Sequence, residues 1–506
     1  MSTSNSNASS SARGDAIGVA VTDAVTATTS DDVDRARFER ACEATPAKIA
    51  KRFAAMHAGR ICHVPGRDWF RWDGTRWLCD DTACGHELTA CIEETSEAVA
   101  RDARRYADDT KRAASLWRAV HQMLDRKGHR AVLEYAATDP QLAVSAPSLD
   151  AHPGLVNFAN GTLDAETGAL RPHRKDDLLT RVISIPFDPS AQCPTWDAFL
   201  DYALNGDHEL IAWLQRCAGY SMTGYTNARA LWVLVGHGRN GKSTLLDTLQ
   251  AVLAPYHVNV QAASLMAKQS VNPSGASPDI ARLAGARYVT AGEIAKGRSL
   301  DDELIKQLTG GVDMITARHL YRGAFDFRPQ CKIWLATNHA PSTSDTSPAM
   351  RDRMRIVPLT RRVTQAQRDA DPDFAARITS ELPGIAAWMV RGLEAYMRAG
   401  QSLGPLPAAV AAASNQWAQD QDPVAQWMSE ACEVGRSFEE THGALYASYR
   451  ASFEQSGHNR APLSSIALGR ALRRQQNDDG APLFGERNRP ELVWTGLRLR
   501  THGAPT

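Results

Sequence analysis

"LVGHGRNGKSTLLDTL", residues 234–249, joins the end of an apolar run to a glycine-rich loop and then to a segment of helical composition. The loop has the spacing GxxxxGK[ST], which falls on Gly236, Gly241, Lys242 and Ser243. Glycines at these positions let the backbone turn tightly and aim its N–H groups at phosphate oxygens. With a strand before it and a helix after it, the stretch predicts a phosphate-binding loop for a nucleoside triphosphate.

The polar residues of this loop have expected roles. Lys242 is expected to reach the β- and γ-phosphates, and Ser243 to hold Mg²⁺. The helix that begins at Lys242 adds the positive end of its dipole. We therefore expect ATP and Mg²⁺ as ligands, with the nucleotide bound by the whole loop: Gly236, His237, Gly238, Arg239, Asn240, Gly241, Lys242, Ser243 and Thr244.

Short apolar segments alternate with helical patterns on both sides of this loop, from residue 230 to residue 360. Such alternation is typical of a mainly parallel sheet with helices on its faces, so the predicted fold class is α/β. The segments predicted as strands are 230–235, 286–291, 331–337 and 354–359.

Polar residues follow two of the predicted strands. Glu293 could hold Mg²⁺ through water or polarise the attacking water, although a surface glutamate is the alternative. Asn338 could sense the γ-phosphate and orient water, although an asparagine at a strand end is commonly only a cap. The stretch "MRDRMRIVPL" then presents three arginines before the last strand: Arg351, Arg353 and Arg355.

A basic hairpin is predicted between these two polar positions. A helix is expected to end at Gly310-Gly311, and residues 314–328 then alternate around a turn at Arg322-Gly323. The hairpin carries Arg318, His319 and Arg322, which a motor could use to contact a polyanion. A solvated edge hairpin is the alternative interpretation.

Five motifs together resemble a known family. They are "GHGRNGKST", "AGE", "IKQLTGGVDMITARHLY", "FDFRPQCKIWLATNHAP" and "RDRMRIVPL". In this order they resemble the superfamily 3 helicase domain of phage and plasmid primase–helicases, which is related to poxviral primase–helicases. The resemblance is strong over residues 150–365 and weak in the flanks. It implies a P-loop NTPase core of AAA+ type, a ring that is usually hexameric, and ATP-driven translocation on single-stranded DNA, usually 3′ to 5′.

The resemblance also implies residue roles. Lys242 and Ser243 match the loop lysine and the Mg²⁺ ligand, and Glu293 matches the acid of the second motif, which makes it a second metal contact. Asn338 matches the sensor, and Arg353 matches the arginine that reaches the ATP of the neighbouring subunit. The residues that match the family's DNA-contact motif are Lys306, Arg318, His319 and Arg322.

Two departures from the family pattern affect these roles. Many members have two adjacent acids in the second motif, whereas here Gly292 precedes Glu293. An aromatic residue is common two positions before the finger arginine, where this chain has Arg351. Arg351 is therefore a rival for the finger role.

Composition and the family resemblance together divide the chain into six expected segments, of which the linker domain, the helicase core and the winged-helix-like domain are implied by the resemblance. The six are a disordered tail (1–34), an N-terminal α+β domain (35–150), a linker and helical domain (151–222), the helicase core (223–365), a helical region (366–421) and a winged-helix-like DNA-binding domain (422–506). From Arg450 onward nine arginines stand against five acids, a net charge of +4, which favours phosphate contact over the alternative of a neutral docking domain.

Two cysteine- and tryptophan-containing stretches before residue 150 have alternative interpretations. Trp69, Phe70, Trp72 and Trp77 flank a hairpin turn and could stack on bases, but a small hydrophobic core is favoured. Cys62, His63, Cys79, Cys84, His86 and Cys91 could bind zinc, but no paired CxxC is present and ordinary thiols are favoured.

The bulk composition excludes little. The 506 residues suffice for about three domains, and 57 basic residues balance 57 acidic ones. The sequence has no signal-peptide pattern and no apolar run near 18 residues, so we expect no membrane partner and a location in the reducing cytoplasm of a bacterium or phage-infected host.

The sequence thus predicts an ATP-dependent DNA helicase of phage, prophage or plasmid replication. Single-stranded and forked DNA, identical subunits of a hexamer, and a separate primase or replication initiator are the expected partners. No cluster of paired catalytic carboxylates indicates primer synthesis. The alternative is a replication initiator that uses ATP to assemble on DNA and unwinds little. A small-molecule kinase is not supported, because no lid-like series of arginines is present.

Overall fold

The computed structural model of the chain describes residues 44–79, 81–267, 278–292, 294, 298–311, 313–318, 324–455, 462–473, 475, 482–488 and 491–500. The expected tail at residues 1–34 lies outside them. The chain forms two compact units. The smaller contains the residues up to His57 together with Leu88–Asp139, and the larger contains Ala58–Glu87 together with the residues from Pro140 onward.

The smaller unit is helical, as the spacing of residues 87–137 predicts. Its helices are α2 (Pro46–His57), the part of α3 (Asp81–Arg105) that follows Glu87, α4 (Thr110–Leu124) and α5 (Arg126–Ala136). Asp109 and Asp125 cap α4 and α5, because each carboxylate accepts a hydrogen bond from a backbone N–H of the first turn. Apolar side chains such as Phe53, Leu116 and Met123 are buried between the helices.

Two small antiparallel sheets open the larger unit. One pairs β1 (Ile61–Val64), β2 (Asp68–Trp72) and β3 (Trp77–Leu78), and the other pairs β4 (Leu155–Phe158), β5 (Gly161–Asp164) and β6 (Leu170–Arg171). Trp69, Phe70 and Trp77 are buried, so the interpretation of these aromatics as a small core is confirmed. Two helices follow within the expected helical domain, α6 (Pro194–Ala203) and α7 (His208–Ser221).

A five-stranded parallel sheet forms the centre of the larger unit, in the order β13-β7-β12-β9-β8. Four strands agree with the predicted segments: β7 (Leu231–Val235), β9 (Tyr288–Ala291), β12 (Lys332–Thr337) and β13 (Met354–Pro358). The prediction missed the edge strand β8 (His257–Val260), because its four residues alternate polar and apolar and carry no continuous apolar run.

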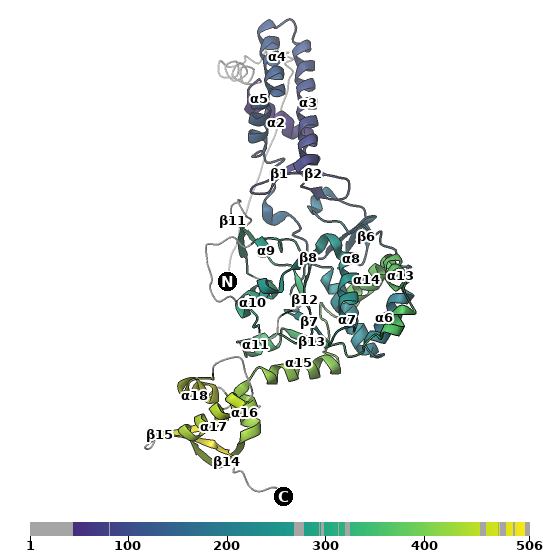
Figure 1. The fold of residues 1–506 in the computed structure, drawn as a ribbon. Coiled ribbons are helices and arrows are strands. Elements are labelled where there is room, and N and C mark those ends of the chain that lie inside the picture. Colours follow the sequence, from purple (N-terminus) through teal and green to yellow (C-terminus); the bar gives the residue numbers. More distant parts are fainter. Residues whose placement is uncertain are drawn as a thin grey trace, which may run out of the picture. The chain divides into compact units, whose positions relative to one another are not determined.

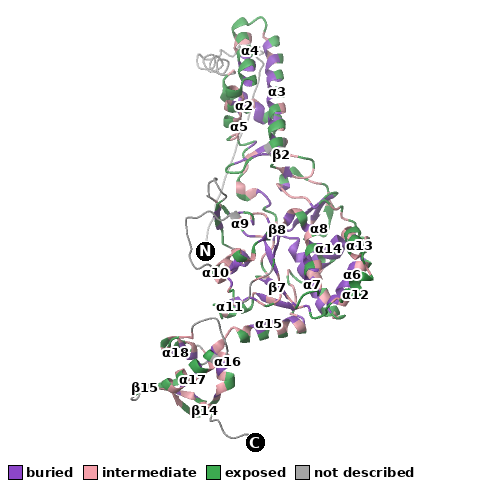
Figure 2. Ribbon diagram, in the orientation of Figure 1, coloured by how far each residue is buried: buried purple, intermediate pink, exposed green. Residues whose placement is uncertain are grey.

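Both faces of this sheet are covered, which explains its nearly continuous apolar strands. Trp232 and Trp334 stack on one face, with ring centroids 5.0 Å apart, and pack in one cluster with α7, α8 (Lys242–Leu253) and α14 (Leu382–Arg398). Val233 and Ile333, each next to one of these tryptophans in the sequence, face the opposite cluster with α9 (Pro278–Ala281), α10 (Asp302–Gly310) and α15 (Ala408–Asp420). Figure 1 shows α9 and α10 on the side of the strands opposite to α7, α8 and α14, and Figure 2 shows the central strands as buried.

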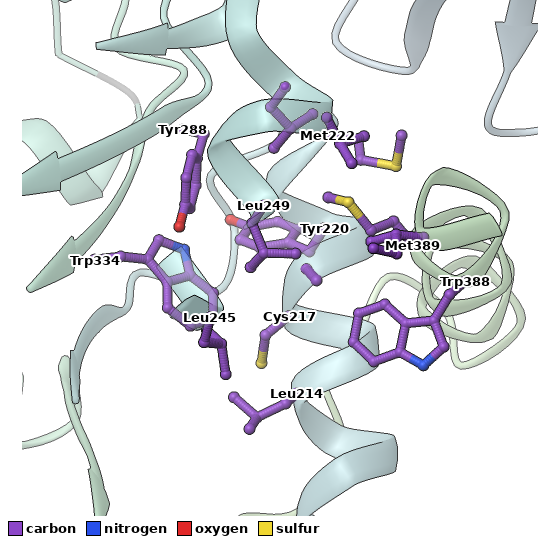
Figure 3. Packing of buried hydrophobic residues seen from close by; sticks show 14 of the residues in the cluster. Leu214, Cys217, Tyr220, Met222, Leu245, Leu249, Tyr288, Trp334, Trp388 and Met389 are labelled. Carbon is purple, nitrogen blue, oxygen red and sulfur yellow. The ribbon is translucent and has the colours of Figure 1, made fainter. Parts of the chain in front are cut away.

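The packing on the first face is dense. Figure 3 shows Trp334 and Tyr288 from the sheet against Leu245 and Leu249 of α8, with Cys217 and the other α7 side chains behind them. This core fixes α8, and with it the loop that precedes α8, against the end of the sheet.

The remaining elements are short or lie after the sheet. They are the antiparallel hairpin β10 (Ile315–Arg318) and β11 (Ala324–Phe327), the helices α11 (Pro348–Arg351), α12 (Gln365–Asp369) and α13 (Phe374–Ser380), and the 3₁₀ turns η1 (Ala146–Ser148), η2 (Lys175–Asp177), η3 (Ala254–Tyr256) and η4 (Ala262–Leu265). Gly311 ends α10 in the left-handed conformation, at the Gly-Gly pair where the sequence predicts a helix end.

The last part of the chain has its own core around Trp427, Tyr449 and Trp494. Its elements run α16 (Pro423–Ala431), β14 (Cys432–Thr441), α17 (His442–Gln455), α18 (Ser465–Arg473), β15 (Gly485–Asn488) and β16 (Leu492–Leu499). The three strands form an antiparallel sheet with β16 in the middle.

Candidate functional site

The loop between β7 and α8 is held in a conformation that only glycine permits at its two ends. A Cβ atom on Gly236 would overlap the Asn240 side chain and the carbonyl oxygen of Leu359. Gly241 has φ of 83°, and a Cβ atom there would lie 2.9 Å from the Phe199 ring. Both glycines are therefore required by close approach of other atoms, and Gly241 also by its left-handed backbone.

Asn240 fastens the middle of the loop. Its side chain is 4% exposed, and its Nδ2 donates a hydrogen bond to the carbonyl oxygen of Leu359 at 2.8 Å. Its Oδ1 accepts a hydrogen bond from Lys242 Nζ at 3.0 Å. The sequence placed Asn240 in the loop but could not show that it ties the loop to the residue after β13.

Lys242 lies inside this loop. It is 8% exposed, and its Nζ donates to the carbonyl oxygen of Gly236 at 2.5 Å. Asn338 Oδ1, at the end of β12, lies 3.5 Å from the same Nζ. The structure thus brings together the loop lysine and the predicted sensor, because β7 and β12 are adjacent parallel strands whose carboxyl ends meet at one edge.

A cleft of about 1150 Å³ opens over the loop. Its lining comes from the loop, from the carboxyl ends of β9 and β12, from α6, and from residues 363–377: Pro194, Thr195, Ala198, Phe199, Tyr202, Gly238, Arg239, Asn240, Gly241, Lys242, Ser243, Thr244, Gly292, Ala336, Asn338, Val363, Gln367, Arg368, Asp371, Pro372, Phe374, Ala375 and Arg377. Its volume exceeds the ~300–1,000 Å³ of typical ligand pockets, so a nucleotide fits.

Two walls of this cleft were not predicted as part of the site. Tyr202 of α6 donates a hydrogen bond to Gln367 Oε1 at 3.2 Å, and the Arg361 guanidinium lies 4.5 Å from the centre of the Tyr202 ring. Arg377 pairs with Asp371 at 2.5 Å on the other wall. The sequence predicts helices in these two segments, but the periodicity of a helix does not show which other element it faces. It therefore could not place these residues at the cleft.

Arg353 does not line this cleft. It lines a second one of about 620 Å³ together with Arg229, Asp302, Glu303, Lys306, Gln307, Gly310, Asp313, Ser344 and Asp345. Arg353 Nε donates to Thr309 Oγ1 at 3.1 Å, and Nη1 donates to the carbonyl oxygen of Ala349 at 2.5 Å. Burial, with the nearby positive charge of Arg229, lowers the pKa of the Arg353 guanidinium. Arg353 therefore lines a different cleft from the one that contains the phosphate-binding loop of its own chain.

Lys306, a predicted DNA contact, forms an ion pair with Asp345 in this second cleft. Burial acts to raise the pKa of Asp345, but hydrogen bonds from Lys306 and Ser347 outweigh it and hold that pKa below its usual value. The charge of Lys306 is therefore balanced within the chain.

The other predicted site residues are only partly described. Arg318 is exposed at the end of β10, opposite Ala324 in the hairpin register. His319, Arg322 and Glu293 lie outside the described residues.

Three arginines in the described C-terminal residues form ion pairs with glutamates from other elements. Arg473 binds Glu486, Arg487 binds Glu439 and Arg498 binds Glu433, at 2.8, 2.8 and 2.6 Å. Two of these glutamates lie on β14, upstream of the segment whose charge the sequence indicated as +4. Over residues 422–506 ten arginines stand against ten acids, so the net charge is zero. The acidic residues before Arg450 therefore cancel the net charge of +4 that is counted from Arg450 onward.

The cysteine and histidine cluster does not assemble into a metal site in the part of the chain that the structure describes. Cys62, Cys84 and Cys91 are buried, and burial raises the pKa of the Cys62 thiol to about 12. Across the described ranges, no helix is long and apolar enough to cross a membrane.

Comparison with known proteins gives matches to two family models and to several viral proteins. Residues 50–205 match the family model described as "D5 N terminal like", and residues 234–353 match a "Family of unknown function (DUF5906)". "Putative helicase L207/L206" of Acanthamoeba polyphaga mimivirus is 26% identical over 311 residues, which are 58% of this chain and 32% of the relative. The chain is similar to phage and viral primase–helicases.

A second viral relative gives a similar match. "Putative helicase 121R" of Invertebrate iridescent virus 3 is 25% identical over 221 residues, 42% of this chain and 23% of the relative. The chain thus spans less than a third of the length of these relatives. Among solved structures, the NrS-1 C-terminal region overlaps 60% of this chain and 69% of its own, with 11% identity and a TM-score of 0.41.

Proposed function

We propose that the protein is an ATP-dependent DNA helicase of superfamily 3, with a P-loop core of AAA+ type. The observation that carries this proposal is the buried Lys242 ammonium, held between a glycine-bounded loop and Asn338 in a cleft of nucleotide size. The viral relatives, which are named as helicases, support the same activity.

The loop residues fit a bound triphosphate. Gly241, in the left-handed conformation, leads into α8, whose first-turn backbone N–H groups have no intrahelical acceptor and can donate to phosphate oxygens. On binding, the Lys242 ammonium would exchange its carbonyl acceptor for β- and γ-phosphate oxygens, while Asn240 keeps the loop fastened. Ser243, at the open first turn of α8, and Glu293 would hold Mg²⁺, which neutralises phosphate charge when bound.

A ring of identical subunits, expected to be hexameric, would complete the site. Arg353 lines a cleft other than the one that contains its own chain's Lys242, so a neighbouring subunit's nucleotide is the fitting target of its guanidinium. We assign to Arg353 the stabilisation of charge on the transferred phosphoryl group, in trans. Arg351 is less suited, because it pairs with Asp422 at 3.6 Å.

DNA contacts are assigned to the hairpin and to the C-terminal part. Arg318, His319 and Arg322 would contact the single strand, joined by Lys306 once it leaves Asp345. The C-terminal order α16-β14-α17-α18-β15-β16, with β16 central, supports a winged-helix fold. Because its net charge is zero, its DNA contacts would depend on individual arginines such as Arg470, which is exposed.

A second candidate is an initiator that assembles on DNA with ATP but unwinds little. The Lys306–Asp345 ion pair favours it, because the pair leaves a predicted motor contact without net charge. Primer synthesis is assigned to neither candidate.

A forked-duplex unwinding assay tests the proposal. The wild-type protein should separate the strands in the presence of Mg²⁺ and ATP, and Lys242→Ala should not. Lys127→Ala, which removes an exposed lysine of the smaller unit, is the matched control and should unwind normally. Nucleotide-dependent assembly on the fork without strand separation would favour the initiator, and unwinding by Lys242→Ala at the wild-type rate would remove the loop assignment.

A further inference from the structure

A cluster of basic and aromatic side chains lies at one end of the helical unit, where α3 ends and α4 begins. We call it the basic–aromatic tip. Its members are Arg101, Arg104, Arg105, Tyr106, Lys111, Arg112, Trp117 and Arg118. All of them belong to the smaller unit, so the cluster exists without reference to the parallel sheet.

The aromatic rings of the tip are paired with guanidinium groups. Arg104 lies 5.7 Å from the centre of the Trp117 ring, and Arg112 lies 3.4 Å from the centre of the Tyr106 ring. Trp117 is 37% exposed, in contrast to the buried Trp69 and Trp77 of the antiparallel sheet. Stacking of arginine on one side of a ring fixes the ring in place and keeps a positive charge beside it.

The tip is also the basic end of its unit. Residues 101–118 contain six basic and three acidic side chains, a net charge of +3. Two of the three acids have structural partners: Asp102 pairs with Arg52, and Asp109 caps α4. No carboxylate of the described ranges lies within 4.0 Å of the cationic groups of Arg104, Lys111 or Arg118, which are exposed.

We propose that the basic–aromatic tip binds single-stranded nucleic acid. Exposed guanidinium and ammonium groups neutralise phosphates, and an immobilised ring such as Trp117 offers a face to an unpaired base. A duplex would present only its phosphates, because its bases are already stacked. An acidic protein segment would use the charges but gain nothing from base stacking.

The test uses the full chain without nucleotide, which separates this proposal from ATP-driven unwinding. Binding of a labelled 25-residue oligothymidylate is measured by fluorescence anisotropy at several salt concentrations. The triple variant Arg104→Ala, Lys111→Ala, Arg118→Ala should lower the slope of log affinity against log salt by about 2, since each single-strand phosphate contact contributes ~0.7. The control triple variant Arg126→Ala, Lys127→Ala, Arg130→Ala removes equal charge on α5 and should leave the slope unchanged.

Trp117 supplies the stacking readout. Trp117→Ala should weaken oligothymidylate binding about fivefold or more, and Trp117→Phe should retain most of the affinity, because it keeps a ring. Basal ATP hydrolysis should be the same in all variants. Equal losses in the two triple variants, no loss with Trp117→Ala, or equally strong competition by polyglutamate would overturn the proposal. Failure of ATP hydrolysis in the wild type would contradict the proposed helicase but not this binding surface.

Discussion

Gly236→Ala tests the loop geometry on which the nucleotide site depends. The new Cβ atom would overlap the Asn240 amide and the backbone carbonyl of Leu359, and a backbone atom cannot rotate away. Overpacking of this kind costs ~1–3 kcal/mol, and the loss of the buried Asn240–Leu359 hydrogen bond adds ~1 kcal/mol. The combined ~2–4 kcal/mol corresponds to an ATP affinity about 30-fold or more below that of the wild type.

Gly292→Ala is the matched control for this substitution. Gly292 lines the same cleft, but its added Cβ atom would meet nothing within 4 Å. Titration with a fluorescent ATP analogue should therefore show near wild-type affinity for Gly292→Ala and a large loss for Gly236→Ala, with unchanged circular dichroism for both. Wild-type affinity and hydrolysis in Gly236→Ala would refute the role given to the loop.

Three further variants address the DNA contacts. His319→Ala combined with Arg322→Ala should retain basal ATPase activity but lose DNA stimulation and unwinding, measured on a fork; unaffected unwinding would make the hairpin purely structural. Asp345→Asn should raise fork affinity severalfold at low salt, because it releases the Lys306 ammonium, and unchanged affinity would argue against Lys306 as a contact. Arg470→Ala should weaken duplex binding more than ATPase activity, and equal duplex affinity would count against the C-terminal part as a DNA-binding domain.

The sequence predicts the parallel sheet because strands covered on both faces must be apolar along their whole length. The segment of β7 is such a run, and the glycine spacing after it leaves few alternatives for the loop. The edge strand β8 escaped prediction because its sequence, HVNV, lacks this signal. Local pattern therefore predicts four strands of the sheet, β13 at the other edge among them, and misses only β8.

Tertiary contacts set the limit of the site prediction. The roles of Asn240 and Tyr202 depend on partners more than 100 residues away in the chain, Leu359 and Gln367, and no local spacing indicates such pairs. The net charge of the C-terminal part was misjudged for the same reason. Glu433, which neutralises Arg498 on the neighbouring strand, lies 65 residues upstream in the sequence. Charge summed along the sequence predicts a surface only where partners are also near in sequence.

The account depends most on a nucleotide site shared between two subunits. Lys242→Ala lacks the loop lysine, and Arg353→Ala lacks the guanidinium assigned to the neighbour, so each protein alone should bind DNA but hydrolyse almost no ATP. The loss from removing such an arginine is roughly 10³–10⁵-fold in rate.

Mixing the two inactive proteins is the decisive measurement. Some interfaces of the mixed rings combine an intact Lys242 from one subunit with an intact Arg353 from the other, so ATPase activity should reappear in proportion to such interfaces. Native mass spectrometry of the same sample shows whether mixed rings form. Normal ATP hydrolysis by Arg353→Ala alone, or no activity in mixed rings that have formed, would contradict the shared site.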